Sequence, residues 1–172
     1  QTLLGAIDWS YELLAPWERV ALQQICVFHG GFFLDDAEAV LQLPPEAPDV
    51  ITAVQMLREK SLLRSWQTTF GPRLGLYLSI QEYGRQKWRE STTAEEREAM
   101  NVRHAAQSLK RPEAAQRERL EFSGRDAALL ELDVQNIRAA HQWAVETRQG
   151  TWACRAAVAV ADEPVEVAAA PQ

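Results

Sequence analysis

The sequence has little of what marks secreted or membrane-spanning proteins. Its 172 residues include only two cysteines, Cys26 and Cys154, too few for the disulfide framework of a small secreted domain, and we expect both to be small buried apolar groups. No run approaches the roughly 18 consecutive apolar residues of a membrane span, and the N-terminus has no signal-peptide pattern. We therefore expect a cytoplasmic protein without membrane contact. Because the chain begins at Gln1 rather than Met, we also expect it to be a piece of a longer protein.

Motifs of enzymes are missing as well. There is no G-x-x-x-x-G-K-[ST] loop to hold a nucleotide triphosphate and no G-x-S-x-G nucleophile elbow. Without that elbow the segment His29–Gly31, which is similar to an esterase oxyanion loop, is interpreted as a glycine helix stop and turn. We predict no catalytic residue, no cofactor-binding residue and no enzyme activity in this chain.

Metal-binding residue types are present without the spacing that a metal site needs. The histidines are His29, His104 and His141. They lie 37 or more residues apart and none belongs to an H-E-x-x-H motif, so we expect structural roles, with His141 forming one hydrogen bond in a helix interface. Asp35, Asp36 and Glu38 offer carboxylates to a divalent cation, but capping of a helix accounts for them. We predict no metal site.

Negative charge is concentrated in the first third of the chain. Residues 1–60 carry the whole formal net charge of -6, because they contain nine acidic and three basic residues. Residues 61–172 contain fifteen acidic and fifteen basic residues. Nucleic-acid binding depends on cations that neutralise phosphates, so this acidic third disfavours it. Later cations alternate with glutamates, which is typical of a solvated helix face. These cations are Lys110, Arg111, Arg117, Arg119 and Arg125, interleaved with Glu113, Glu118 and Glu121.

Apolar residues at helical spacing predict four helices in the first 60 residues. We expect them over residues 2–14, 16–28, 35–43 and 49–60. The buried stripe of the first is Leu4, Ile7, Tyr11 and Leu14. Asp35 with Glu38 forms a capping box for the third, and Asp49 caps the fourth.

The apolar period then changes from helix to strand and back. We expect a hairpin with strands at residues 61–68 and 74–78, because Leu74, Leu76 and Leu78 alternate with other residues after a Gly-Pro turn. Thr93 with Glu96 is a second capping box. Further helices are expected at residues 80–91, 93–111 and 130–150, with a helix stop at Pro112, a polar connection at 113–125 and an Ala-rich continuation at 152–160.

Helices followed by a hairpin are the order of a winged helix, so we predict a mainly α chain with a small β-hairpin wing. Direct DNA binding is nevertheless not expected. The helix before the hairpin offers only Arg58 and Lys60 at its C-terminal end, Asp49 stands where bases would be met, and the wing offers only Arg73.

Several strings occur in an order that resembles the region after the nucleotide-binding module of bacterial STAND-class signal-transduction ATPases, which include AfsR-like and LuxR-like regulators. The strings are TLLGAIDWSYELL (2–14), VFHGGFFLDDAEAV (27–40), EKSLL (59–63), YLSIQEYG (77–84) and RHAA (103–106). A further string, ELDVQNIRAAHQWA (131–144), is similar to the segment that leads into tetratricopeptide-type repeats. The resemblance covers roughly residues 1–155.

The resemblance implies a regulatory arm with a winged helix at residues 1–91, a helical segment at 92–160 that leads into tetratricopeptide-type repeats, and a disordered tail at 161–172. In such proteins the winged helix packs on an upstream ATPase module, which holds ADP when closed and ATP when open, while the repeats receive a protein or small-ligand input. ATP or ADP would be the parent's cofactor, with none bound by this chain. Related members place a Met-His-Asp triplet where Leu76, Tyr77 and Leu78 stand here, so no nucleotide-sensing residue is carried over.

Three functions follow as hypotheses. The leading one is a non-catalytic regulatory segment that docks intramolecularly on the upstream nucleotide-binding module and couples it to a helical sensor. The alternatives are a winged-helix DNA-binding transcription factor and a structural helical interaction module.

Overall fold

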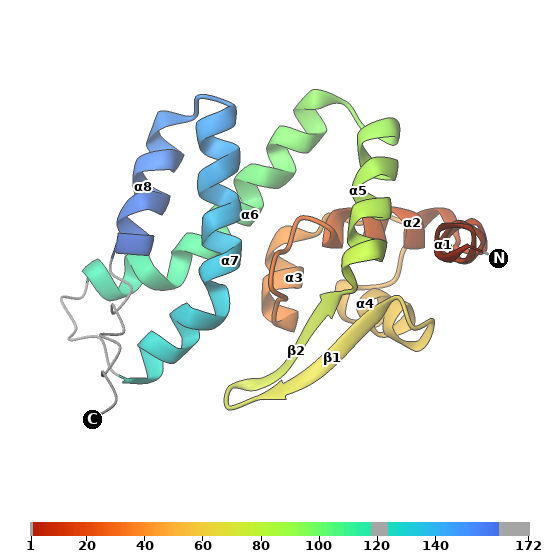
Figure 1. Cartoon of the computed structure of the whole chain (residues 1–172), viewed down its shortest axis with the longest axis horizontal. Helices are drawn as coiled ribbons and strands as arrows, with labels where there is room; N and C mark the ends of the chain where they lie inside the picture. Colours follow the sequence, from red (N-terminus) through yellow and green to blue (C-terminus); the bar gives the residue numbers. More distant parts are fainter. Residues whose placement is uncertain (1, 118–123, 162–172) are drawn as a thin grey trace.

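The computed structural model describes residues 2–117 and 124–161, and in this part of the chain a single hairpin projects from the edge of a set of helices (Figure 1). The elements are α1 (Leu3–Glu12), α2 (Pro16–Ile25), α3 (Leu34–Val40), α4 (Val50–Glu59), β1 (Leu63–Thr68), β2 (Gly71–Leu76), α5 (Leu78–Ser91), α6 (Ala94–Arg117), α7 (Gly124–Glu146) and α8 (Gly150–Ala161). The predicted mainly α, winged-helix-like fold with a β-hairpin wing and a following helical segment is confirmed. None of the helices in the described ranges combines the length and apolar character needed to cross a bilayer.

Local capping explains where several helices begin. Thr2 accepts a hydrogen bond from the Gly5 amide at 3.2 Å, and Asp49 accepts one from Thr52 at 2.9 Å. At the start of α6, Thr93 and Glu96 cap each other's backbone amides reciprocally at 2.8 and 3.2 Å. These side chains satisfy amides that have no partner inside the helix.

The hairpin joins the helices through a short backbone bridge. Its register runs from Leu63 opposite Leu76 to Thr68 opposite Gly71. Just before α3, Phe32 and Leu74 exchange two backbone hydrogen bonds of 2.8 and 2.9 Å, which adds a third, one-residue strand to the sheet. The wing is therefore fixed to the helical core along β2.

Gly31 makes this close approach possible. Its φ of 97° lies in the left-handed region, and a Cβ at this position would lie 2.5 Å from the Trp66 ring and 2.7 Å from the Leu74 carbonyl oxygen. The Gly30–Gly31 turn predicted after α2 is thus confirmed, and it serves the wing.

Two clusters of buried apolar side chains form the interior. The winged-helix core is rich in aromatic and branched residues from α1 to α5 and includes Tyr11, Phe28, Phe32, Leu57 and Tyr83. Within the part of the chain that the structure describes, the helical-segment core is smaller and consists of Leu109, Leu130, Ile137, Ala156 and Ala159. Helix α6 contributes to both, because Met100 belongs to the first cluster and Leu109 to the second.

Several predicted boundaries were wrong. Helix α2 ends at Ile25 rather than Phe28, and α3 begins at Leu34, where Asp36 rather than Glu38 accepts the Phe33 amide at 2.9 Å. Leu78 opens helix α5 and is 77% exposed, so the alternating pattern ended at Leu76. The reason is that a short leucine alternation also fits the first turn of a helix.

The later helices are longer than predicted. Helix α6 continues past the buried Pro112 to Arg117, and α7 begins at Gly124 within the segment expected to be a polar connection. Proline inside a helix loses one backbone hydrogen bond, and here the packing of Leu109 and ion pairs of Arg111 and Glu113 with neighbouring helices hold the chain helical beyond it. Of the expected tail 161–172, Ala161 ends α8 and the remainder lies outside the described residues.

Two burial predictions also differ from the structure. Leu4 is 63% exposed, although Ile7, Tyr11 and Leu14 of the same stripe are buried. Cys26 is buried as expected, but Cys154 is exposed on α8.

Candidate functional site

The surface that a winged helix would offer to DNA carries few free cations. Asp49 stands at the N-terminus of α4, and the Lys60 ammonium lies 2.6 Å from the buried Glu18 carboxylate. Arg58 is exposed. On the hairpin the exposed cation is Arg64, whose guanidinium stacks over Trp66 at 4.8 Å.

Arg73, which the sequence suggested as the wing's contact for DNA, points the other way. It is 0% exposed, and its Nη2 donates to Gly31 O at 2.9 Å, Leu132 O at 2.7 Å and Asp133 Oδ1 at 3.0 Å. Its Nη1 has no hydrogen-bond partner among the described residues. Arg73 is therefore not available to DNA, because β2 turns this side chain into the space between the winged helix and α7.

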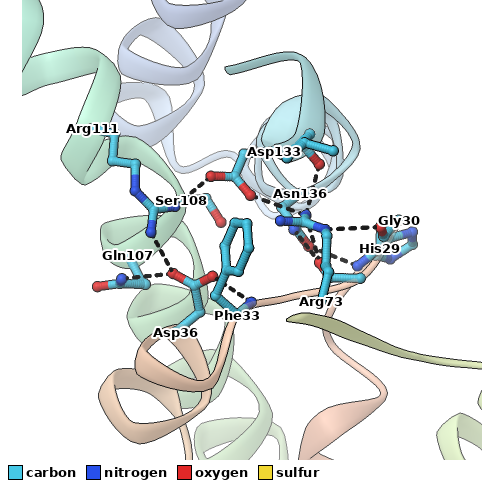
Figure 2. Close-up of polar contacts among 12 residues, drawn as sticks. His29, Gly30, Phe33, Asp36, Arg73, Gln107, Ser108, Arg111, Asp133 and Asn136 are labelled. Atoms are coloured by element: carbon cyan, nitrogen blue, oxygen red, sulfur yellow. Dashed lines mark hydrogen bonds and ion pairs between the residues drawn. The ribbon is translucent and has the colours of Figure 1, made fainter. Parts of the chain in front are cut away.

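Asp133 on α7 joins Arg73 to a second arginine. Its Oδ2 accepts from Arg111 Nη1 at 2.6 Å, and the other side of Arg111 lies 3.4 Å from Asp35 and 3.7 Å from Asp36 (Figure 2). The opposing carboxylates keep the pKa of Arg111 above its ordinary value even though burial acts against them. Alternating cations and anions therefore run from β2 through α7 and α6 to α3.

Phe33 lies between the two guanidiniums. Arg73 is centred 4.8 Å from its ring and Arg111 5.6 Å, and Figure 2 shows the ring standing between them. Cation–π attraction adds to the ion pairs, since the ring face carries negative charge density.

A second set of contacts centres on Asn136, one helical turn beyond Asp133. Its Oδ1 accepts from the His29 amide at 2.7 Å and lies 3.2 Å from His104 Nε2, while its Nδ2 donates to Gly31 O at 2.9 Å. The Asn136 side chain thus contacts both the glycine turn after α2 and helix α6.

Both histidines beside Asn136 are held neutral near pH 7. Burial lowers the pKa of His104 to about 4, and burial with the nearby Arg85 lowers the pKa of His29 to about 4. The structural role expected for His29 and His104 is consistent with these contacts, while His141 is half-buried on α7. No group of three potential ligands that could hold a metal ion occurs within residues 2–117 and 124–161.

We call this set the polar junction. It comprises His29, Asp36, Arg73, His104, Arg111, Asp133 and Asn136. A buried ionic network fixes a geometry more than it adds stability, because desolvation offsets much of the attraction while loss of one partner leaves a buried charge. The junction can thus hold the winged helix and the helical segment in one defined arrangement.

The acidic cluster and the later basic group meet in this junction. Asp36 is buried and accepts from Gln107 at 2.9 Å as well as from Phe33, and Asp35 pairs with Arg111, so these carboxylates face protein cations. Glu38 is exposed. Arg111 was wrongly assigned to a solvated face, whereas Lys110 is exposed as expected.

The other members of that basic group behave differently. Arg125 is exposed near Phe70 at the hairpin turn, and Glu113 pairs with Arg155 of α8 at 2.6 Å. The side chains of Arg117, Glu118, Arg119 and Glu121 lie outside the described part of the structure.

Sequence reasoning missed Asp133 and Asn136. Both are polar residues inside the apolar stripe of α7, beside the buried Leu130, Val134 and Ile137. A polar pair three residues apart on the buried face of a helix was the signal available, because such groups need buried partners.

Comparisons with known proteins find similarity to part of the length of much longer proteins. Over 153 residues it is 29% identical to a candidate HTH-type transcriptional regulator of Mycobacterium tuberculosis and to one of Mycobacterium bovis, covering 85% of this chain and 16% of each of those proteins. Over 40 residues it is 50% identical to an uncharacterized protein of Mycobacterium tuberculosis, covering 23% of this chain and 10% of that protein. Neither a protein-family model nor a solved structure gives a significant match. The chain thus spans 16% of the length of the regulators to which it is similar.

Proposed function

We propose that this chain is a non-catalytic regulatory arm of a STAND-type transcriptional regulator in the cytoplasm. The arm docks on an upstream nucleotide-binding module and couples it to a helical sensor of the tetratricopeptide type. The observation that carries the proposal is the inward orientation of Arg73 and its pairing with Asp133. Because this wing cation holds the chain's own helical segment, the wing serves internal coupling.

The similarity to much longer regulators supports this reading. A segment that corresponds to 16% of a protein named for transcriptional regulation fits a part that transmits a signal between other modules. Within the proposal, any ATP or ADP is bound by the upstream module.

Helix α1 offers a surface for docking. Leu3, Leu4 and Trp9 on α1 are 69%, 63% and 68% exposed, and Leu13, which caps the C-terminal end of this helix, is 62% exposed. Large apolar side chains grouped on one element are typical of a surface that another protein part covers. The acidic character of the first third is compatible with a protein partner and unfavourable for phosphate.

Hydrogen–deuterium exchange tests the proposal. Upstream coding sequence that contains a P-loop is the first requirement. In the longer protein, α1 amides should exchange at least about tenfold more slowly with ADP than in the isolated 172-residue chain, and ATP should reverse this protection. Substitution Leu13→Glu should remove the protection, whereas the exposed Leu78→Glu on α5 serves as the matched control.

Equal exchange of α1 with ADP and with ATP would overturn nucleotide-dependent docking and leave a structural helical interaction module.

DNA binding is the second candidate because Arg58 and Arg64 are exposed and the relatives are named HTH-type regulators. Fluorescence anisotropy with a labelled duplex at about 150 mM salt separates it from docking. We expect no saturable binding by this chain. Salt-sensitive binding that Arg64→Gln weakens would favour a DNA-binding winged helix instead.

A further inference from the structure

A cleft of about 930 Å³ lies where α5, the first half of α6 and the last turns of α7 meet, beside the polar junction, whose His29 and His104 also line it. Figure 1 shows that α6 passes between α5 and α7 in this region. The volume is in the range of small-molecule sites, about 300–1,000 Å³. The cleft is formed by both the winged helix and the helical segment, so an occupant would touch both.

Three guanidiniums line this cleft without a carboxylate partner. They are Arg85, Arg89 and Arg97. In the described part of the chain none of them forms an ion pair, whereas Arg19, Arg73, Arg111 and Arg155 each have a carboxylate. In a chain with a net charge of -6, three neighbouring unpaired arginines are a distinctive feature of the surface.

The contacts of these arginines position them without neutralising them. Arg85 is half-buried, and its Nε donates to Cys26 O at 3.1 Å while its Nη2 lies 2.5 Å from His29 Nε2. Burial and the nearby Arg85 lower the pKa of His29, so the neutral imidazole accepts this hydrogen bond, and an imidazole carries no negative charge that could neutralise the guanidinium. Arg97 donates to the Thr92 carbonyl oxygen and to Arg89 O at 3.4 Å, which orders its guanidinium at the beginning of α6.

Two carboxylates also line the cleft and limit the charge of its occupant. Glu98 accepts from Gln149 at 2.6 Å, and Glu146 accepts from Gln142 at 2.8 Å. Three cations against two anions favour a ligand with one anionic group over a polyanion such as nucleic acid.

The aromatic lining indicates the shape of the ligand. Trp88 of α5 and Trp143 of α7 both line the cleft and are half-buried. Indole rings offer flat apolar faces for stacking, and a guanidinium binds a carboxylate or phosphate through two parallel hydrogen bonds.

We propose that this cleft binds a small planar aromatic ligand that carries one carboxylate or phosphate group, held by Arg85, Arg89 and Arg97 and stacked on Trp88 or Trp143. The ligand connects the winged helix to the helical segment. This inference stands apart from docking, since all of its residues belong to this chain.

Titration of the 172-residue chain tests the proposal through its tryptophan signals. The six indole N–H resonances of the ¹⁵N-labelled chain are assigned with Trp88→Phe and Trp143→Phe, and the probes are indole-3-acetate, phenyl phosphate, inorganic phosphate and the neutral indole-3-acetamide. The two aromatic anions should shift the Trp88 and Trp143 signals saturably. The neutral amide should bind at least about tenfold more weakly, as expected for loss of a charge-assisted contact.

Matched arginine variants identify the anion site. Arg97→Gln and the exposed Arg89→Gln should each weaken indole-3-acetate at least about fivefold, since each removes one cationic partner. Arg64→Gln, an exposed arginine on the hairpin away from the cleft, should have no effect. If Arg97→Gln disturbs folding, because Arg97 is held by backbone hydrogen bonds, Arg89→Gln still tests the anion site.

Each remaining outcome counts against the proposal. Absence of saturable shifts with either aromatic anion at about 10 mM would overturn it, since a usable site binds more tightly than that. Equal binding of the neutral amide, or equal loss in Arg64→Gln, would show that the guanidiniums of the cleft are not the anion site. If inorganic phosphate alone shifted the signals equally, the cleft would bind an anion without needing an aromatic ring, and the proposed ligand class would be wrong.

Discussion

The winged-helix core and the helical-segment core are built from different side chains. The first contains Tyr11, Phe28, Phe32 and Tyr83 with many branched residues, and the Tyr11 and Tyr83 rings meet edge to face at 5.4 Å. Among the described side chains, the second consists of Leu109, Leu130 and Ile137 with two small alanines of α8. Aromatic and branched residues bury far more surface each than alanine. We therefore expect the polar junction to matter more for the stability of the helical segment than for that of the winged helix.

Substitution of Asp133 tests this expectation with the largest predicted loss of stability. Asp133→Ala leaves Arg73 fully buried without its carboxylate, and we expect a loss of about 3–5 kcal/mol in the free energy of unfolding. Urea unfolding followed by circular dichroism should also change from one transition to two, with the helical segment unfolding first.

Two controls distinguish burial from charge alone. Glu12→Ala removes the exposed partner of Arg19 and should cost less than about 1 kcal/mol. Arg73→Met combined with Asp133→Leu should recover most of the lost stability, because the pair is then replaced by apolar groups. A single transition with unchanged midpoint in Asp133→Ala would show that the junction does not hold the two parts together.

Leucine truncation compares the two cores directly. Leu57 and Leu109 are both fully buried, one in each core. Leu→Ala costs about 2–5 kcal/mol, and we expect Leu57→Ala in the upper half of this range and Leu109→Ala in the lower half, because helices packed through alanine can close around a small cavity. Equal losses of unfolding free energy in the two variants, measured by urea titration, would show that the two cores respond alike to a cavity.

Gly84 shows how tightly α5 packs in the winged-helix core. A Cβ there would lie 2.4 Å from Cys26 Sγ at the C-terminal end of α2, so Gly84→Ala should lower the unfolding free energy by up to about 3 kcal/mol. Gly150→Ala is the matched control, because its Cβ meets nothing within 4 Å. Thermal unfolding of both variants checks this, and an equal Tm would contradict the close packing.

Acid weakens the contact between the two regions through His104. This side chain packs against Phe28 and lies 3.2 Å from Asn136 on α7. Its pKa of about 4 in the folded chain is below the ordinary 6.5, so the unfolded chain binds the proton more readily and stability falls as the pH drops through this interval. The contribution is about 2 kcal/mol between pH 7 and pH 5.

Urea titrations of the native chain and of His104→Gln at both pH values measure this contribution. The variant should lose less stability on acidification than the native chain does. The same pH dependence in both would show that His104 does not titrate in this way.

Features with local causes could be predicted from the sequence. The caps at Asp49 and Thr93, the hairpin and the glycine turn depend on residues within a few positions of each other. The continuation of α6 past Pro112 could not be predicted, since distant packing outweighs a local stop signal.

The candidate site was less predictable for the same reason. Arg73 and Asp133 are 60 residues apart, and an isolated arginine in a hairpin looks like a surface cation until the opposite helix is known. The burial of Asp36 likewise involves Gln107, which is 71 residues away and donates to its other carboxylate oxygen.

The bridge between Phe32 and Leu74 determines the direction of the neighbouring Arg73. Successive strand residues point to opposite faces, so the pairing that places Leu74 in the core also aims Arg73 at Asp133. A slip of one residue in this pairing would expose Leu74 and, at the same time, leave Asp133 without Arg73. The orientation of the helical segment is therefore encoded in the backbone register of a single strand.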